Sequence, residues 1–171
     1  MACVTQLIYH PAFDPYNALL RTVRVLAAIP KGVDSMALRI LEFYLLFPEQ
    51  LVGMRLSPKL RSAVRRLSAS ARYPYDRLPA SRSVFERMGS SFDAALQTLS
   101  VRGLVDVNAF AHVTLRADQV PKELADLIRE QNEEEKNLMS VLTAIASEFA
   151  TAGSNGLKDR SGLAEYRYDV V

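Results

Sequence analysis

Few of the side chains that bind metals or carry out catalysis occur in this sequence. Its one cysteine, Cys3, has no partner for a disulfide and cannot form a thiolate metal site. The two histidines, His10 and His112, have neither a cysteine nor a second histidine at ligand spacing, so we expect surface or capping roles and no zinc site. No glycine-rich phosphate loop, nucleophile elbow or HExxH motif occurs. The sequence therefore predicts no enzyme, no cofactor and no metal.

Long hydrophobic runs are also absent. The most apolar stretch, residues 36–47, includes Arg39 and Glu42 and is closed by Pro48, which makes it too short to cross a bilayer. No basic segment followed by an apolar one occurs at the N-terminus, so no secretory signal peptide is expected. With 49% hydrophobic and 23% charged residues, the composition predicts a globular protein of the cytoplasm. The formal net charge of +2 argues neither for nor against nucleic-acid binding.

What the chain does contain is a series of helix signals. Asp14-Pro15 joins a capping carboxylate to a proline at the first helical position. Apolar side chains then recur at helical spacing, which places Arg21 and Arg24 on the opposite side of this first helix. The run at 36–47 predicts a second helix that is apolar almost all round, and either its own fold or a partner must cover it.

The middle of the chain predicts two helices and a hairpin. The first helix starts at Ser81 or Ser83 and is broken by Gly89. The second, capped by Ser90 or Ser91, ends at Gly103, where a residue that tolerates positive φ is favoured. The segments LVDV and HVTL then predict an antiparallel hairpin. Helices followed by strand, loop and strand are the order of a winged helix.

A long helix is predicted from Pro121 to about Ala150. Its two apolar ends are separated by the polar REQNEEEKN, so we expect it to leave one packed body, cross solvent and dock elsewhere or on another chain. Residues 165–170 alternate as a strand does. We therefore predict a mainly α fold with a small β component: a winged-helix domain with N-terminal helices over residues 1–120, then a long helix and terminal strand over residues 121–171 that pack on this domain or a partner.

The second serine-capped helix would occupy the position of a DNA-reading helix. Its buried stripe is predicted to comprise Phe92, Ala95, Leu96 and Leu99. Its outward face then carries Asp93, Ala94, Gln97 and Val101. A groove-reading helix usually presents Arg, Lys, Asn or Gln, and only Gln97 qualifies, while Asp93 would repel phosphate. Because the hairpin tip also lacks Arg and Lys, this outward face favours contact with a protein partner.

A basic segment is the better candidate for contact with nucleic acid. Residues 55–72 hold six basic residues and no acidic one, and they include a third predicted helix after Ser57-Pro58. Phosphate contacts need positive charge but no base code, so the segment predicts contacts to a DNA backbone. The alternative is a solvated face that complements the acidic stretch 118–135, and the sequence leaves both open. The candidate phosphate contacts are Lys59, Arg61, Arg65, Arg66 and Arg72.

Three stretches carry a resemblance to a known family: YHPAFDPYNALLRTVRVL near the start, YPYDRLP at 73–79 and NGLKDRSGLAEYRYD near the end. They resemble the middle-component proteins of bacterial three-component ABC systems, which include the small third subunit of Lamassu-type anti-phage defence systems. The resemblance covers nearly the whole chain. It implies a non-catalytic adaptor that binds an SMC/Rad50-like ABC ATPase and an effector subunit, often a nuclease. Non-specific contact with DNA through such a complex is a separate expectation.

The last of these stretches contains Lys158, Asp159 and Arg160. We interpret them as a partner-binding or folding element, and a charged turn before a terminal strand is the alternative. The first functional hypothesis is thus an adaptor in a bacterial complex that defends against phages or plasmids. The second is a winged-helix transcription regulator that binds duplex DNA. An enzyme with an unfamiliar site is a third hypothesis, which no constellation of residues supports.

Overall fold

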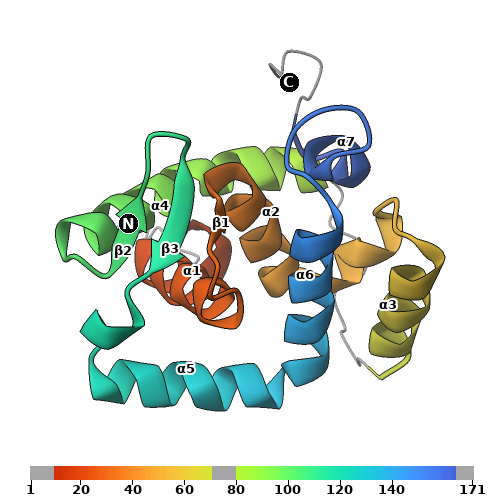
Figure 1. The fold of residues 1–171 in the computed structure, drawn as a ribbon. Helices are drawn as coiled ribbons and strands as arrows, with labels where there is room; N and C mark the ends of the chain where they lie inside the picture. The colour runs from red at the N-terminus through yellow and green to blue at the C-terminus, as the bar shows by residue number, and fades with distance from the viewer. Residues whose placement is uncertain (1–9, 71–79, 165–171) are drawn as a thin grey trace, which may run out of the picture.

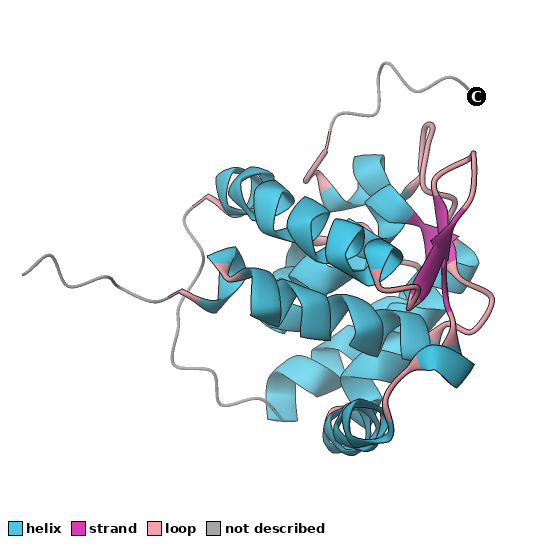
Figure 2. Ribbon diagram, turned by 90° about the vertical axis from the view of Figure 1, so that its left-hand side faces the viewer, coloured by secondary structure: helices cyan, strands magenta, loops and turns pink. Residues whose placement is uncertain are grey.

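The computed structural model describes residues 10–70 and 80–164. The α-helices are α1 (Pro15–Ala28), α2 (Ser35–Leu46), α3 (Pro58–Ser70), α4 (Ser81–Val101), α5 (Lys122–Glu134), α6 (Lys136–Glu148) and α7 (Leu157–Ser161) (Figure 1). Short 3-10 helices are η1 (Pro11–Phe13), η2 (Pro48–Gly53) and η3 (Ala117–Gln119). The strands are β1 (Val33–Asp34), β2 (Val105–Val107) and β3 (His112–Leu115). Figure 2 shows the strands along one side of the helices. The predicted mainly α fold with a small β component is confirmed.

Helix α2 lies at the centre of the body. Asp34 caps it by accepting hydrogen bonds from the backbone N–H groups of Met36 and Ala37. Buried side chains occur on every side of the helix. Helices α1, α4, α6 and α7 pack around it. The fold itself therefore covers the helix that is apolar almost all round.

The sheet is antiparallel, with the strand order β1-β3-β2. Strands β2 and β3 form the predicted hairpin, and Gly103 before it has a φ of +69°, as predicted for a helix end. Strand β1 is too short for a periodic signal and was not predicted. It pairs Val33 with Val113, and a Cβ on the preceding Gly32, whose φ is +74°, would collide with the Val113 carbonyl oxygen. Close approach of two backbones therefore requires glycine at this position.

The predicted break at Gly89 is wrong, because α4 continues through this residue. A Cβ on Gly89 would lie 2.6 Å from Arg39 Nη2, which donates to the Phe85 carbonyl oxygen at 2.8 Å. The predicted serine cap is wrong for the same reason. Ser91 lies inside α4, and its hydroxyl donates to the Phe13 carbonyl oxygen at 2.8 Å. The glycine thus provides space for an arginine and does not end a helix.

The predicted long helix between Pro121 and Ala150 is also wrong. Helices α5 and α6 are separated by Glu135, whose φ of −106° and ψ of 27° are not helical. The two helices meet at a large angle and both pack on the same body (Figure 1), so the chain does not cross solvent to a second one. Arg24 of α1 fastens the bend, because it donates to Asn132 Oδ1 at 2.9 Å and forms an ion pair with Glu135.

The polar side predicted for the first helix is wrong as well. Arg21 and Arg24 are buried, with 5% and 9% of their surface exposed. Arg21 donates from Nε to Glu42 Oε1 and from Nη1 to the Pro11 carbonyl oxygen, both at 3.0 Å. Each arginine can be buried because acceptors on another element pair with its charged guanidinium.

The described part of residues 121–171 packs on the rest of the chain. Helix α5 contacts α1, α6 contacts α2 and α3, and α7 contacts α2. The predicted terminal strand at 165–170 lies outside the described residues, as do Arg72 and the YPYDRLP stretch at 73–79. Among the described helices, none has the length and apolar character needed to span a membrane.

Candidate partner-binding surfaces

The second half of α4 has the two faces that the sequence predicts. Phe92, Ala95 and Leu99 are buried and Leu96 is half-buried, which confirms the predicted buried stripe. This stripe faces the body, where α4 packs on α1. The exposed residues opposite are Asp93, Ala94, Gln97 and Val101. Their role in partner binding stays a prediction.

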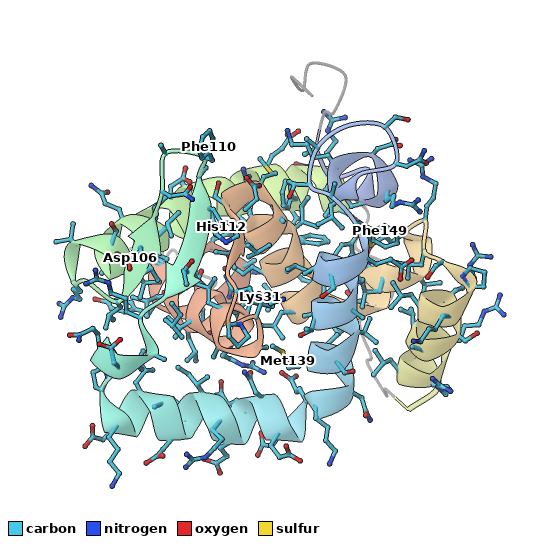
Figure 3. All side chains as sticks on the ribbon, in the orientation of Figure 1. Lys31, Asp106, Phe110, His112, Met139 and Phe149 are labelled. Carbon is cyan, nitrogen blue, oxygen red and sulfur yellow. The ribbon has the colours of Figure 1, made fainter. Side chains whose placement is uncertain are left out.

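Large apolar side chains are exposed at the end of α4 and on the hairpin. Val101 is 82% exposed, Val107 at the end of β2 is 44% exposed, and Phe110 in the hairpin turn is 88% exposed. Figure 3 shows Phe110 at the hairpin tip, away from the helical body. These three residues lie on consecutive parts of the chain, α4, β2 and the hairpin turn, and large exposed apolar side chains are frequent in protein-binding sites. We name as the α4–hairpin surface the residues Asp93, Ala94, Gln97, Val101, Val107 and Phe110.

Defined hydrogen bonds fix the hairpin turn that displays Phe110. Asn108 Oδ1 accepts hydrogen bonds from the backbone N–H groups of Phe110 and His112, at 2.9 and 3.0 Å. The carbonyl oxygen of Ala111 accepts from the Ser35 N–H at 2.9 Å, which joins the turn to the start of α2. Because the turn is already ordered, a partner that covers Phe110 loses little conformational entropy in binding it.

The α4–hairpin surface carries little positive charge. Residues 90–111 contain one basic side chain, Arg102. Arg116 at the base of the hairpin is 2.7 Å from Asp106, so a carboxylate already neutralises it. Asp93 adds a negative charge. A DNA groove lined by phosphates would meet few cations at this surface.

Helix α3 forms a second exposed surface, made of basic residues. Leu60 and Val64 are buried on its inner side, where α3 packs on η2 and α6. The outer side holds most of the predicted phosphate contacts, whereas Arg72 lies outside the described residues. We name as the α3 basic strip the exposed residues Lys59, Arg61, Arg65 and Arg66.

The acidic stretch 118–135 has cationic partners on α1 and close by in its own sequence. Its ion pairs join Asp126 to Arg129, Glu133 to Lys136 and Glu135 to Arg24. Figure 1 shows α5, which contains most of this stretch, along a different edge of the molecule from α3. The interpretation of the basic segment as its counterpart therefore gains no support from the fold.

Lys158, Asp159 and Arg160 lie in α7, so the predicted charged turn is a short helix. Arg160 Nη1 donates to the Arg55 carbonyl oxygen at 2.9 Å, and the Arg55 N–H donates to the Arg160 carbonyl oxygen at 3.1 Å. The backbone N–H of Asn155 and then the Arg55 guanidinium hold the pKa of Asp159 below its ordinary value. These contacts fasten α7 to the segment before α3, and a partner-binding role stays a prediction.

A buried ion pair between α1 and α2 was not predicted. Arg21 Nη2 lies 2.9 Å from Glu42 Oε1, and 1% of the Glu42 side chain is exposed. Burial raises the pKa of Glu42 to about 7, although the charge of Arg21 opposes this shift. The sequence signal was a carboxylate within a mostly apolar helix. Its partner could not be identified, because Arg21 fits the polar side of α1 equally well.

A groove of about 420 Å³ lies between α1, β3 and α5. Small apolar side chains such as Ala28 and Ala125 line it together with the polar Arg129, Asn132 and Glu133. It brings together none of the predicted site residues. In the described parts of the chain, no group of three or more His, Cys, Asp or Glu side chains is placed to hold a metal ion.

Comparison with known protein families identifies the chain. Residues 7–169 match the family described as ABC-three component (ABC-3C) system Middle Component 5. The chain belongs to this family. Predicted membership of the middle-component proteins is therefore confirmed, whereas the closer resemblance to Lamassu-type third subunits stays a prediction. The comparisons with curated proteins and with solved structures found no match. As a Middle Component 5 protein, the chain is one part of a multi-component system, which implies protein partners.

Proposed function

We propose that this chain is a non-catalytic adaptor subunit of an ABC-3C complex. It binds an SMC/Rad50-like ABC ATPase and a nuclease-like effector subunit in the cytoplasm, in a bacterial complex that defends against phages or plasmids. The observation that carries this proposal is the α4–hairpin surface, where Val101, Val107 and Phe110 are exposed on ordered backbone. Membership of a middle-component family supports a role between other subunits.

The order of elements supports a winged-helix domain as the core of this adaptor. Helix α1, strand β1 and helix α2 are followed by α4 and the β2–β3 hairpin, with β3 between the other two strands. In a winged helix, a helix-turn-helix precedes such a hairpin. Helix α4 then takes the position of the recognition helix, the hairpin is the wing, and η2 with α3 forms an insertion.

The composition of α4 and the wing favours protein over DNA as the partner of this surface. A recognition helix that enters the major groove presents Arg, Lys, Asn or Gln to bases and phosphates. The outer face of α4 has Gln97, and Arg102 follows the helix, while Asp93 faces solvent beside them. Apolar Phe110 occupies the wing tip, where DNA binders need a polar or basic side chain. The apolar core of a protein interface accommodates such residues.

Co-purification of the chain with the products of its neighbouring genes tests the proposal. We expect a tagged full-length chain, expressed from its native operon, to elute with an ABC ATPase subunit and a second protein in fixed ratio. A chain that elutes alone at every salt concentration would contradict an adaptor role.

A winged-helix transcription regulator is the second candidate, because the element order also fits one. It requires sequence-selective binding of the isolated chain to the DNA upstream of its own gene. A mobility-shift titration against that DNA and a shuffled duplex of equal length measures this selectivity. We expect equal affinity for the two duplexes, and a preference of about 1,000-fold or more for the upstream DNA would favour the regulator.

A further inference from the structure

The small net charge of the chain conceals an uneven distribution. No acidic residue occurs between Glu49 and Asp76, whereas α5 alone contains five carboxylates and two basic side chains. Figure 1 shows α3 at one end of the molecule and α5 along another edge. The α3 basic strip therefore gives one part of a nearly neutral protein a positive electrostatic potential. Such a potential attracts polyanions.

The strip is arranged as two basic rows along one helix. By helical periodicity, Arg61 and Arg65 lie one turn apart on one side of the exposed face, and Lys59 and Arg66 lie two turns apart on the other. The row between them contains the small side chain of Ser62. This arrangement lets the phosphate backbone of one DNA strand lie along the helix between two rows of cations.

Three of the four strip residues keep a charge that no described carboxylate neutralises. Lys59, Arg61 and Arg65 make no ion pair with a carboxylate among the residues that the structure describes. Arg61 makes one hydrogen bond, from Nη2 to the Leu56 carbonyl oxygen at 3.1 Å, which orients the guanidinium without neutralising it. These side chains retain their charge and most of their donors for a bound anion.

The helix beneath the strip has a fixed position. Leu60 and Val64 are 4% and 3% exposed and pack on the body. Ala63 and Leu67 are half-buried against the same core. Residues 59–66 span roughly 10 Å of helix. Because duplex DNA carries a charge about every 1.7 Å along its axis, a strip of this length faces several phosphates.

The composition of the outer face of α3 favours nucleic acid over an acidic protein. Its exposed residues are basic, serine, Pro58 and Ala69, and none is a large apolar side chain. Protein interfaces have an apolar core, whereas interfaces with DNA are more polar and strongly positive. The α4–hairpin surface, which exposes valine and phenylalanine, has the opposite composition.

We propose that the α3 basic strip binds the phosphate backbone of duplex DNA without reading its sequence. Lys59, Arg61, Arg65 and Arg66 each contact phosphate, and the base edges are not touched. This site is separate from the α4–hairpin surface. A Middle Component 5 protein of this kind contacts DNA with one end and a protein with the other.

Fluorescence anisotropy of the full-length chain with two unrelated short duplexes tests this proposal. We expect equal affinity for both, and a plot of log K against log salt with a slope of about −3 to −4, because about 0.9 counterion is released for each phosphate neutralised. The variant K59Q/R61Q/R65Q should lose more than about tenfold in affinity at 0.1 M salt, with a slope near −1. The matched control K122Q/R129Q, which removes two basic residues from α5, should bind as the unaltered chain does.

Three results would overturn the proposal. The first is an unaltered slope in the α3 variant while its circular dichroism stays that of the unaltered chain. The second is no binding of the unaltered chain at low salt. The third is poly-glutamate competing as well as DNA at equal charge, which would identify an acidic protein as the ligand. Because V101D leaves the strip intact, normal DNA binding by that variant distinguishes this site from the adaptor surface.

Discussion

The α4–hairpin surface and the α3 basic strip are both exposed, and they differ in almost every chemical respect. The first combines Val101 and Phe110 with few charges, and the second combines arginine and lysine with small polar residues. Figure 1 shows α3 and the C-terminal end of α4 at opposite ends of the molecule. A single small fold therefore offers one surface suited to protein and one suited to a polyanion.

The difference also shows why position in a fold does not decide what a helix binds. In the winged-helix arrangement that we propose, α4 takes the place of a recognition helix, yet its outer side chains do not suit a DNA groove. Helix α3 lies outside that arrangement and carries the cations. Function follows the side chains that a site presents, and the fold only places them.

We expect buried side chains of α4 to stabilise the fold more than buried side chains of α3. This comparison gives the largest expected change in the free energy of unfolding. Leu99 is a fully buried residue of α4, so L99A should reduce the free energy of unfolding by about 4 kcal/mol. Val64 anchors the more peripheral α3, so V64A should cost about 2 kcal/mol. Urea unfolding followed by circular dichroism measures both. Equal losses would show that α3 is as central to the core as α4.

The buried Glu42 should make stability depend on pH without altering either surface. Because its pKa rises from 4.5 to about 7 on folding, the folded chain retains a proton that the unfolded chain has lost. Its contribution is therefore full below pH 4.5 and is lost as pH rises through 7, by about 3 kcal/mol at most. Unfolding free energies from pH 4.5 to 8 should fall with pH, and E42Q should remove most of this slope. A slope unchanged in E42Q would contradict the assignment.

A smaller effect is expected where α7 meets the segment before α3. Asp159 accepts a hydrogen bond from Asn155 and pairs with Arg55, so D159N should speed hydrogen exchange at the Arg55 amide by less than about tenfold. The matched control is D106N, which removes the hairpin ion pair with Arg116 and should leave exchange at Arg55 unchanged. Hydrogen exchange at the Arg55 amide is measured by NMR. If its rate rises equally in D159N and D106N, the hairpin and the α7 contacts are not independent.

Local geometry explains which elements the sequence predicted. The Asp14-Pro15 helix start, the positive φ at Gly103, the hairpin and the buried stripe of α4 all depend on residues close in sequence, and each is confirmed. Such features follow from capping, backbone freedom and periodicity, which a single sequence records.

Three of the wrong predictions involve an arginine that is distant in the sequence. Arg39 occupies the space that Gly89 leaves, Arg24 fastens the bend at Glu135, and Arg21 is buried against Glu42. A glycine within a helix looks the same in the sequence whether or not a distant arginine packs against it. The same is true of a polar run between two apolar segments. The sequence also predicted which residues of α4 are exposed, but not that Asn108 orders the hairpin turn that exposes Phe110.

Affinity capture of the complex with the double variant V101D/F110D tests the central claim most directly. Both side chains are exposed, so the variant should fold normally and retain less than about one tenth of the ATPase and effector subunits that the unaltered chain retains. The matched control is V52D, because Val52 is 64% exposed on η2, away from the α4–hairpin surface, and it should retain both subunits. Undiminished capture by V101D/F110D would contradict the assignment of this surface to a protein partner.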